Sequence, residues 1–315
     1  MAVDNALQRV DDLLLSIADS AVPLLRQTSQ HILGAGGKRV RPRLLLLSYE
    51  AAGGTNFDEA IPLAAAVEII HTATLVHDDI NDHGTLRRGR ETVNSRWGGT
   101  YALLTGDYLF TRTYELMAPY STELNRILAR ASTALVEGET MQIQAAREGT
   151  FDAATYFEII SRKTAALFVA SAELGATAAN PPAAWVSALS QYAFNLGIAF
   201  QLIDDVLDLA SDSAHLGKNA GIDIAQGRGI AVAIQSAGGS GSKSPAAVEV
   251  QNDLSRDALQ DAILRGYTVD DAIAKGRAKA QEFAGLALAQ LDTLPASHAV
   301  EALRDLAHQV IERDH

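Results

Sequence analysis

Apolar residues recur at the three- and four-residue spacing of amphipathic helices along nearly the whole chain. The alternating pattern of a half-buried strand is not clear at any point in the sequence. The expected helices, one or two of them within the first range, are 4–33, 44–52, 56–82, 100–118, 122–147, 152–177, 183–211, 247–265, 269–291 and 296–313. The pattern predicts an all-α fold, one domain spanning residues 1–315, with ten or more helices.

Capping and helix-breaking residues mark several boundaries. Pro62 suits the first turn of the helix that begins near residue 56, since proline lacks only an N–H that is unpaired there. Thr150 and Thr268 are expected N-caps. Thr92 to Gly99 is interpreted as a connection, and the Gly/Ser-rich stretch 236–244 as a flexible surface loop.

Composition narrows the class of protein. The chain has 315 residues, a net charge of −12 and no cysteine. The acidic balance argues against a nucleic-acid partner, and the absence of cysteine excludes disulfides and thiol catalysis. No apolar run approaches membrane-spanning length, and the N-terminus lacks a basic region followed by an apolar core. We therefore expect a cytoplasmic protein without a transmembrane segment.

Two acidic motifs carry the main chemical signal. Each has the pattern DDxxD after an apolar helical run: Asp78, Asp79 and Asp82 in the first, and Asp204, Asp205 and Asp208 in the second. One copy arises by chance in roughly one such chain in ten, and two copies in about one in a hundred. Carboxylates this crowded need cations, and hard oxygen ligands suit Mg²⁺ shared with a substrate phosphate. If the two faces converge, they can hold several Mg²⁺ ions around one diphosphate.

Basic residues near the first motif suit the same ligand. Four cations stand at a glycine-rich helix entrance: Lys38, Arg39, Arg41 and Arg43. Free N–H groups at a helix start favour an anion, and Arg87 and Arg88 would hold phosphates from the side. The loop is not a P-loop, because Lys38 is followed by arginine instead of serine or threonine.

The chain resembles the trans-isoprenyl diphosphate synthases, and most closely their medium- and long-chain members. The resemblance runs from about Leu24 to Arg313 through ordered motifs: Gly-Gly-Lys-Arg-Val-Arg-Pro, the two acidic motifs with their flanks, Leu-Arg-Arg-Gly, Gly-Asp-Tyr-Leu, Glu-Gly-Glu and Lys-Thr-Ala-Ala-Leu-Phe. It implies the isoprenoid synthase type of helical bundle, in which the helices surround a central active-site cavity. It also implies head-to-tail condensation of isopentenyl diphosphate with an allylic diphosphate to an all-trans product.

The resemblance also implies residue roles. The positions for the isopentenyl diphosphate group are Lys38, Arg41, His71 and Arg88. Those for the allylic diphosphate are Arg87, Lys163 and Lys218, with Arg228 as a further cation. The main Mg²⁺ ligands are Asp78, Asp82 and Asp204, supported by Asp79, Asp205 and Asp208. Thr164 and Gln201 match polar positions beside the ionising carbon, and Gln142 stands where some members place another acid. We expect three Mg²⁺ per active site, with Mn²⁺ as a substitute.

Charge and position explain the implied chemistry. Metal and basic side chains stabilise the negative charge that grows on the departing diphosphate, so the allylic C–O bond ionises. The catalytic set is Asp78, Asp79, Asp82, Arg87, Lys163, Thr164, Gln201 and Asp204. Holding the allylic cation against the isopentenyl double bond makes addition effectively unimolecular. The released diphosphate can take the final proton, so no side-chain base is required.

Product length is predicted from the residues before the first motif. Ala73 and Thr74 lie about one helical turn before Asp78, where short-chain members usually place an aromatic floor. Two small side chains leave the tunnel open, which favours a product of roughly six to ten isoprene units, C30–C50. A short-chain product such as farnesyl or geranylgeranyl diphosphate is the main alternative.

Other readings stay open at this point. A homodimer is expected, with 100–118 and 122–147 as interface candidates, but the catalytic subunit of a heteromeric long-chain synthase carries the same motifs. Two intact acidic motifs argue against a terpene cyclase and against a regulatory subunit. Two departures from the family pattern are Gly227-Arg-Gly-Ile-Ala-Val232 and His83-Gly84, and neither removes a metal ligand.

Overall fold

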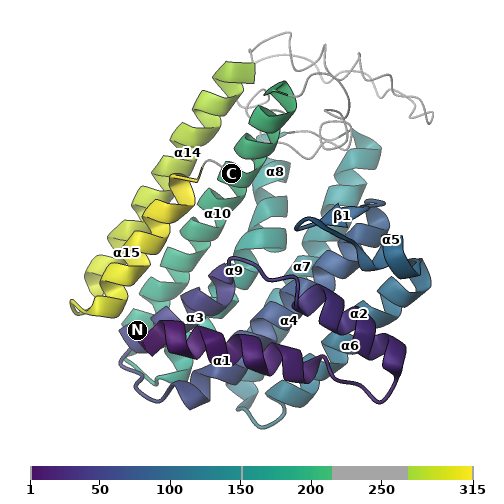
Figure 1. Cartoon of the computed structure of the whole chain (residues 1–315). Coiled ribbons are helices and arrows are strands. Elements are labelled where there is room, and N and C mark those ends of the chain that lie inside the picture. Colours follow the sequence, from purple (N-terminus) through teal and green to yellow (C-terminus); the bar gives the residue numbers. More distant parts are fainter. Residues whose placement is uncertain (1, 150–151, 215–268, 314–315) are drawn as a thin grey trace. The chain divides into compact units, whose positions relative to one another are not determined.

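The computed structural model describes residues 2–149, 152–214 and 269–313, and it confirms the all-α prediction for them (Figure 1). The chain divides into two compact units, which are described separately. Unit 1 comprises Met1–Ser132, Leu167–Ser190 and Thr293–Leu303. Unit 2 comprises Thr133–Ala166, Gln191–Asp292 and Arg304–His315. The single domain expected from the sequence stays a prediction.

Unit 1 is built around one central helix, α4 (Phe57–Asn81), which packs against α1, α3 and α6. Its other elements are α1 (Ala2–Ile17), α2 (Pro23–Leu33), α3 (Val40–Ala51), β1 (Leu86–Arg87), β2 (Arg90–Glu91), α5 (Val93–Trp97), α6 (Gly99–Met117), the first part of α7 (Thr122–Glu148), nearly all of α9 (Ala166–Ala178), and the beginnings of α10 (Ala183–Ala214) and α15 (His298–Ile311). Four consecutive leucines of α3, Leu44–Leu47, are buried, because neighbours cover this helix on all sides.

Helix α4 begins where the sequence predicted, directly after Asn56, but Pro62 does not lie in its first turn as expected. The Asn56 side chain caps it by accepting the Asp58 N–H at 3.2 Å, with Asp58 and Glu59 in the first turn. Pro62 therefore lies in the second turn, where it removes one intrahelical hydrogen bond. By length and composition α4 and α10 could cross a membrane, but most of each is buried inside the protein. We interpret both as core helices.

The end of α4 has a defined geometry that places the first acidic motif. Asp82 is the C-cap and His83 adopts a left-handed conformation with φ 53°. The Gly84 N–H donates to the Asp79 carbonyl at 3.0 Å, and the His83 N–H donates to the Ile80 carbonyl at 3.4 Å. These two bonds form a Schellman motif, in which histidine takes the position usually held by glycine. The motif's carboxylates thus lie at the negative end of the helix dipole, where cations are favoured.

A small β-hairpin follows the first acidic motif. The sequence pattern did not predict this hairpin. β1 and β2 pair antiparallel around Arg88 and Gly89, which have φ values of 52° and 73°. Positive φ at both central residues matches a type I′ turn. The expected connection from Thr92 to Gly99 contains α5, whose N-cap Thr92 accepts the Ser95 N–H at 3.0 Å. Two strand residues on each side are too few for an alternating pattern to show.

Unit 2 contains the second motif on α10. Its other elements are the end of α7, α8 (Ala153–Ile160), the π-helical turn η1 (Ser161–Ala165), α14 (Val269–Gln290), the 3₁₀ turn η2 (Leu291–Thr293), which ends in unit 1, and the end of α15. Its core is formed by Ile160, Ala165, Ile198, Leu202, Ile203, Val206 and Ala280.

The α8 cap is Asp152, which accepts the Thr155 N–H at 2.8 Å, so the cap predicted at Thr150 is wrong. Predicted features outside the described residues are Thr150, Thr268, the loop 236–244 and the helix 247–265.

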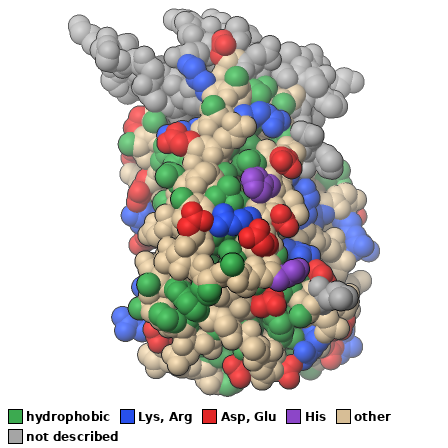
Figure 2. All heavy atoms as spheres, turned by 90° about the vertical axis from the view of Figure 1, so that its left-hand side faces the viewer, with side chains coloured by type: hydrophobic (Ala, Val, Ile, Leu, Met, Phe, Trp, Pro, Cys, Tyr) green, Lys and Arg blue, Asp and Glu red, His purple; other side chains and the backbone are tan. Residues whose placement is uncertain are grey.

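The surface mixes both charges. Acidic and basic side chains are interspersed over the face drawn in Figure 2. On α6 the exposed large apolar side chains are Tyr101, Leu103, Leu104 and Tyr114. This composition suits the interface expected at 100–118, and the homodimer itself stays a prediction.

Candidate functional site

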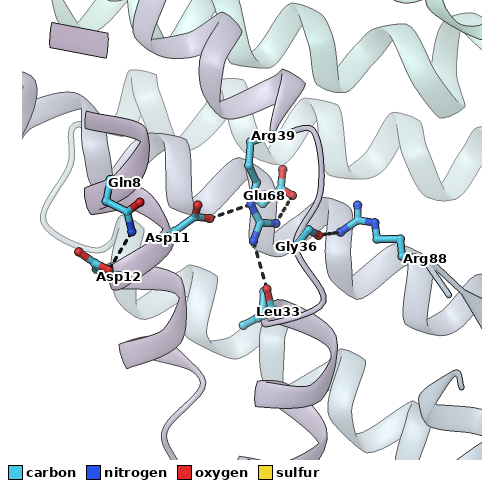
Figure 3. A network of polar contacts seen from close by, with 8 residues as sticks. All are labelled: Gln8, Asp11, Asp12, Leu33, Gly36, Arg39, Glu68 and Arg88. Atoms are coloured by element: carbon cyan, nitrogen blue, oxygen red, sulfur yellow. Dashed lines mark hydrogen bonds and ion pairs between the residues drawn. The ribbon is translucent and has the colours of Figure 1, made fainter. Parts of the chain in front are cut away.

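Arg39 is the structural anchor of the basic loop in unit 1. Its guanidinium donates to Glu68 Oε1 at 2.7 Å, to Asp11 Oδ1 at 2.8 Å and to the Leu33 carbonyl at 3.1 Å (Figure 3). The Arg39 and Glu68 side chains are only 11% and 3% exposed. Burial would lower the pKa of Arg39, but Glu68 and Asp11 raise it above its ordinary value. Of the four loop cations in the sequence, this one serves the fold.

We expect Glu68→Gln to lower the free energy of unfolding by about 2 kcal/mol, because it leaves a buried guanidinium without its charged partner. Urea denaturation of the ligand-free protein measures the change. The matched control is Asp11→Asn, which alters the other partner of Arg39. Asp11 is 40% exposed, so we expect less than about 1 kcal/mol there. Equal losses in the two variants would contradict the anchor role.

Three further arginines of unit 1, Arg41, Arg87 and Arg88, act electrostatically on His71. Arg88 donates to the Gly36 carbonyl, and a Cβ on Gly37 would approach Arg88 Nη1 to 2.7 Å. Gly37 therefore allows the guanidinium to lie directly on the loop backbone. The Arg41 guanidinium lies over the Phe168 ring, 4.9 Å from its centroid. Lys38 is exposed at the same loop.

His71 shows what this arrangement can bind. Burial, and then the positive charges of Arg41, Arg88, Arg87 and Arg39, hold the pKa of His71 well below 6.5. A pKa lowered by several guanidiniums indicates a concentrated positive potential at His71, which a polyanion would neutralise. The sequence prediction placed His71, Arg41 and Arg88 at one diphosphate, and the electrostatic coupling shows that these residues gather in unit 1.

This coupling predicts the pH dependence of stability. The unfolded chain protonates His71 near pH 6.5, whereas the folded ligand-free chain does not. The contribution of His71 to the free energy of unfolding is therefore complete above pH 6.5. It is lost as the pH falls from 6.5 toward the lower pKa that His71 has in the folded chain. We expect the free energy of unfolding to fall less steeply with acidification in His71→Gln than in the parent. Urea denaturation at several pH values from 8 to 5 measures this free energy. The same pH dependence in both proteins would contradict the prediction.

In the first acidic motif, the middle carboxylate is committed to the protein. Arg87 Nε donates to Asp79 Oδ1 and Oδ2 at 2.9 and 3.1 Å, and Arg87 Nη2 lies 2.8 Å from Oδ1. Burial raises the pKa of Asp79, while Arg87 lowers it. Asp78 and Asp82 are partly exposed at the end of α4. Asp79 thus orients Arg87, and the outer two carboxylates are better placed for a metal.

The predicted chain-length residues lie on α4. Ala73 is fully buried, one turn before His77, whose Nε2 lies 3.2 Å from the Leu103 carbonyl of α6. Thr74 is partly buried, and its hydroxyl donates to the His71 carbonyl at 2.8 Å. The polar group of Thr74 is therefore satisfied within its own helix. A role in setting product length stays a prediction for both residues.

In unit 2, the Lys-Thr pair lies on a π-helical turn instead of a regular helix. Such turns are rare and frequent at functional sites. Lys163 Nζ forms an ion pair with Glu139 and lies 3.2 Å from Gln142 Oε1. A Cβ on Gly138 would come within 2.7 Å of the Lys163 backbone nitrogen, so glycine lets α7 approach the turn closely. The sequence reading gave Glu139 no role, although its neighbours were named.

The middle carboxylate of the second motif is likewise held by protein donors. Tyr156 OH donates to Asp205 Oδ2, and Gln201 Nε2 donates to Asp205 Oδ1 at 2.9 Å. Burial raises the pKa of Asp205 to about 7, opposed by the hydrogen bonds from Tyr156 and Gln201. Burial and the Asp205 charge raise the pKa of Tyr156 well above 10. Thr164 Oγ1 donates to Gln201 Oε1 at 2.7 Å, so the structure brings these predicted site residues together.

A C-terminal arginine was missed as a candidate. Arg313 Nη1 lies 2.9 Å from Asp204 Oδ1, and its guanidinium stacks over the Phe200 ring with 4.7 Å to the centroid. Arg313 was noticed only as the end of the family resemblance, since a lone arginine at a helix end carries no motif. Asp208 lies one turn beyond Asp204 on α10. Lys218 and Arg228 lie outside the described residues.

The acidic motifs fit a divalent metal through their chemistry. Within the part of the chain that the structure describes, no group of three His, Asp or Glu side chains is gathered closely enough to form a closed metal site. Mg²⁺ does not need one, because it keeps several waters and shares its shell with substrate phosphates. The carboxylates at the negative end of α4 are hard ligands at a position that favours a cation.

Comparison with known proteins gives consistent relatives. Residues 22–263 match the family model described as polyprenyl synthetase. The octaprenyl diphosphate synthase of Haemophilus influenzae is 34% identical over 99% of this chain and 95% of its own. Heptaprenyl diphosphate synthase component 2 of Geobacillus stearothermophilus is 36% identical over 99% and 97%. A short-chain isoprenyl diphosphate synthase of Methanothermobacter thermautotrophicus is 34% identical over 95% and 94%.

A solved structure agrees with these relatives. The polyprenyl synthase of Caulobacter crescentus CB15, complexed with calcium and isoprenyl diphosphate, is 35% identical and superimposes with a TM-score of 0.85. The similarity covers 100% of this chain and 96% of that one. A divalent metal and an isoprenyl diphosphate thus occur together in a protein of this fold. The chain belongs to the polyprenyl synthetase family, and it is a metal-dependent prenyltransferase that makes polyprenyl diphosphates.

Proposed function

We propose that the enzyme condenses isopentenyl diphosphate head-to-tail with an allylic diphosphate and makes an all-trans product of roughly C30–C50. The observation that carries this proposal is the group of arginines, Arg41, Arg87 and Arg88, whose charges act on His71 of α4, the same helix that ends in the first acidic motif. The octaprenyl and heptaprenyl synthases among the relatives support the longer product. The short-chain relative keeps a shorter product as the alternative.

In this proposal the basic residues divide between two substrates. Lys38, Arg41, His71 and Arg88 bind the isopentenyl diphosphate group, whose negative charge compensates their crowding. Arg87 and Lys163 bind the allylic diphosphate, together with Lys218 and Arg228. Asp79 and Glu139 set the positions of Arg87 and Lys163 through the ion pairs described above.

The carboxylates Asp78, Asp82 and Asp204 would hold Mg²⁺, three ions per site with Mn²⁺ as a substitute, and Asp208 would support them. When bound, the metal neutralises charge on the leaving diphosphate. Arg87 and Lys163 add to that stabilisation, which favours ionisation of the allylic C–O bond. Thr164 and Gln201 orient oxygen atoms beside the carbon that becomes positive. Water must be excluded from the proposed site, because it would quench the cation to an alcohol.

The proposed assembly is a cytoplasmic homodimer that uses the exposed apolar side chains of α6. The relative named as component 2 of a heptaprenyl synthase favours a second possibility, a catalytic subunit that needs a different partner chain. Size-exclusion chromatography with light scattering separates a stable dimer from a chain awaiting a partner. A monomer without activity would favour the heteromeric alternative.

Product analysis tests the proposed function. Purified protein is incubated with Mg²⁺, isopentenyl diphosphate and, in separate reactions, dimethylallyl, geranyl, farnesyl or geranylgeranyl diphosphate, and the products are sized after dephosphorylation. We expect chains of about thirty carbons or more. Chains that stop at about fifteen or twenty carbons would establish the short-chain alternative. Folded dimeric protein that extends no starter would contradict the proposal.

A further inference from the structure

Four side chains of unit 2 form a directed chain of hydrogen bonds. Tyr156 OH donates to Asp205 Oδ2, Gln201 Nε2 donates to Asp205 Oδ1, and Thr164 Oγ1 donates to Gln201 Oε1. Three of these residues belong to the predicted site. Tyr156, on α8, has no role assigned by any motif in the sequence.

We propose that Tyr156 is a positioning residue for the ionisation step, which acts through Asp205 and Gln201 on the hydroxyl of Thr164. The kinetic part of this inference rests on the proposed function, whereas the structural part does not.

The direction of the chain follows from its carboxylate end. Gln201 turns its NH₂ group toward Asp205 Oδ1, which accepts from it, and its carbonyl oxygen toward Thr164. The Thr164 hydroxyl must then donate its proton to Gln201. Its oxygen lone pairs remain for the reacting centre, where they would face a carbon that becomes positively charged.

The Tyr156 hydroxyl keeps the carboxylate in this orientation. Without it, Asp205 Oδ2 would lose its hydrogen-bond donor, which is unfavourable for a carboxylate oxygen away from bulk water. Rotation of the carboxylate toward another donor would recover part of that cost. The same rotation would misalign Oδ1, and with it the Gln201 amide.

The π-helical turn explains how Tyr156 and Thr164 reach one face. In a regular α-helix, residues eight apart point about 80° away from each other. A π-helical turn contains one extra residue. Tyr156 and Thr164 are therefore oriented like residues seven apart in a regular α-helix, with roughly 20° between them. Both side chains therefore meet α10. The Tyr156 ring also packs against Phe157, with 5.5 Å between centroids, and against the core of unit 2, so its hydroxyl has a stable base.

Tyr156→Phe removes the hydroxyl and keeps the ring. The first measurement is methyl NMR of ligand-free protein labelled at threonine methyl groups, with the Thr164 signal assigned from its loss in Thr164→Ser. We expect Tyr156→Phe to shift or broaden this signal because the Thr164 rotamer is released. The matched control is Tyr49→Phe, which removes a buried hydroxyl that donates to the Asn56 carbonyl at 3.0 Å in unit 1. An unchanged Thr164 signal in Tyr156→Phe would overturn the inference.

Steady-state kinetics provides the second measurement. We expect Tyr156→Phe to lower kcat about 10- to 100-fold and to leave KM for isopentenyl diphosphate unchanged, since only positioning beside the ionising carbon is lost. In a double-mutant cycle, Tyr156→Phe should have little further effect once Gln201→Ala is present. Multiplicative losses, or an unchanged kcat in Tyr156→Phe, would overturn the inference. If the parent itself makes no product, the proposed function fails, and the NMR result still decides whether the chain exists.

Discussion

Asp78→Asn should lower kcat by about a thousandfold or more, the largest effect expected of any single substitution in unit 1. The exchange removes a negative charge and a hard ligand but nearly preserves side-chain volume. The ionisation step loses metal-assisted stabilisation of the leaving diphosphate, which positioning alone does not replace. Product formation under saturating substrates, measured over a range of Mg²⁺ concentrations, gives kcat and the metal requirement.

Stability separates this loss from misfolding. Asp78 lies at the negative end of the α4 dipole, beside two other carboxylates. Removing its charge should therefore leave the thermal midpoint of the metal-free protein unchanged or raise it slightly, by about 0.3–1 kcal/mol in free energy. Adding Mg²⁺ and inorganic diphosphate should also raise the thermal midpoint of Asp78→Asn less than it raises that of the parent. The matched control is Asp12→Asn, an exposed residue of α1. Parent-like activity in Asp78→Asn would remove this carboxylate from the mechanism.

Ala73→Phe should shorten the main product from the C30–C50 range to about fifteen or twenty carbons. The added ring would form a floor one turn before Asp78, on the face of α4 along which the proposal places the growing tail. Because Ala73 is fully buried, the ring must also be accommodated, at a cost of about 1–3 kcal/mol. Product sizing by chromatography after dephosphorylation measures the outcome.

Two further alanines of α4 serve as controls. Ala64 is fully buried like Ala73, but it lies nine residues away and about 180° around the helix. Ala64→Phe should therefore destabilise the protein without shortening its product. Ala66 lies about two turns before Ala73 on nearly the same face. Ala66→Phe should give products longer than those of Ala73→Phe and shorter than those of the parent. Equal products from all three variants would place the length-setting surface elsewhere.

The basic loop shows both the reach and the limit of sequence reasoning. Four cations within six residues predict an anion site, because charge density is readable from the chain alone. The sequence does not distinguish Arg39 from Arg41. Arg39 is committed to Glu68, a residue 29 positions away. Only this tertiary contact distinguishes it from Arg41 and Arg88, which are proposed to bind substrate.

The acidic motifs show the same division. Their spacing identifies two diphosphate-handling helices, but it treats the three carboxylates of each motif as nearly equivalent. Arg87 occupies Asp79, and Tyr156, which is 49 residues from Asp205, donates to that second middle carboxylate. The contact of Arg313 with Asp204 likewise joins residues that are far apart in the sequence.

The sequence alone determined the helical class, most helix positions, the two acidic motifs and the family to which they belong. These follow from periodicity and from chemistry carried within a few neighbouring residues. Only the tertiary structure decided which charged groups serve the fold and why the pKa of His71 is lowered. Those properties depend on burial and on partners brought close by folding, and local spacing does not encode either quantity.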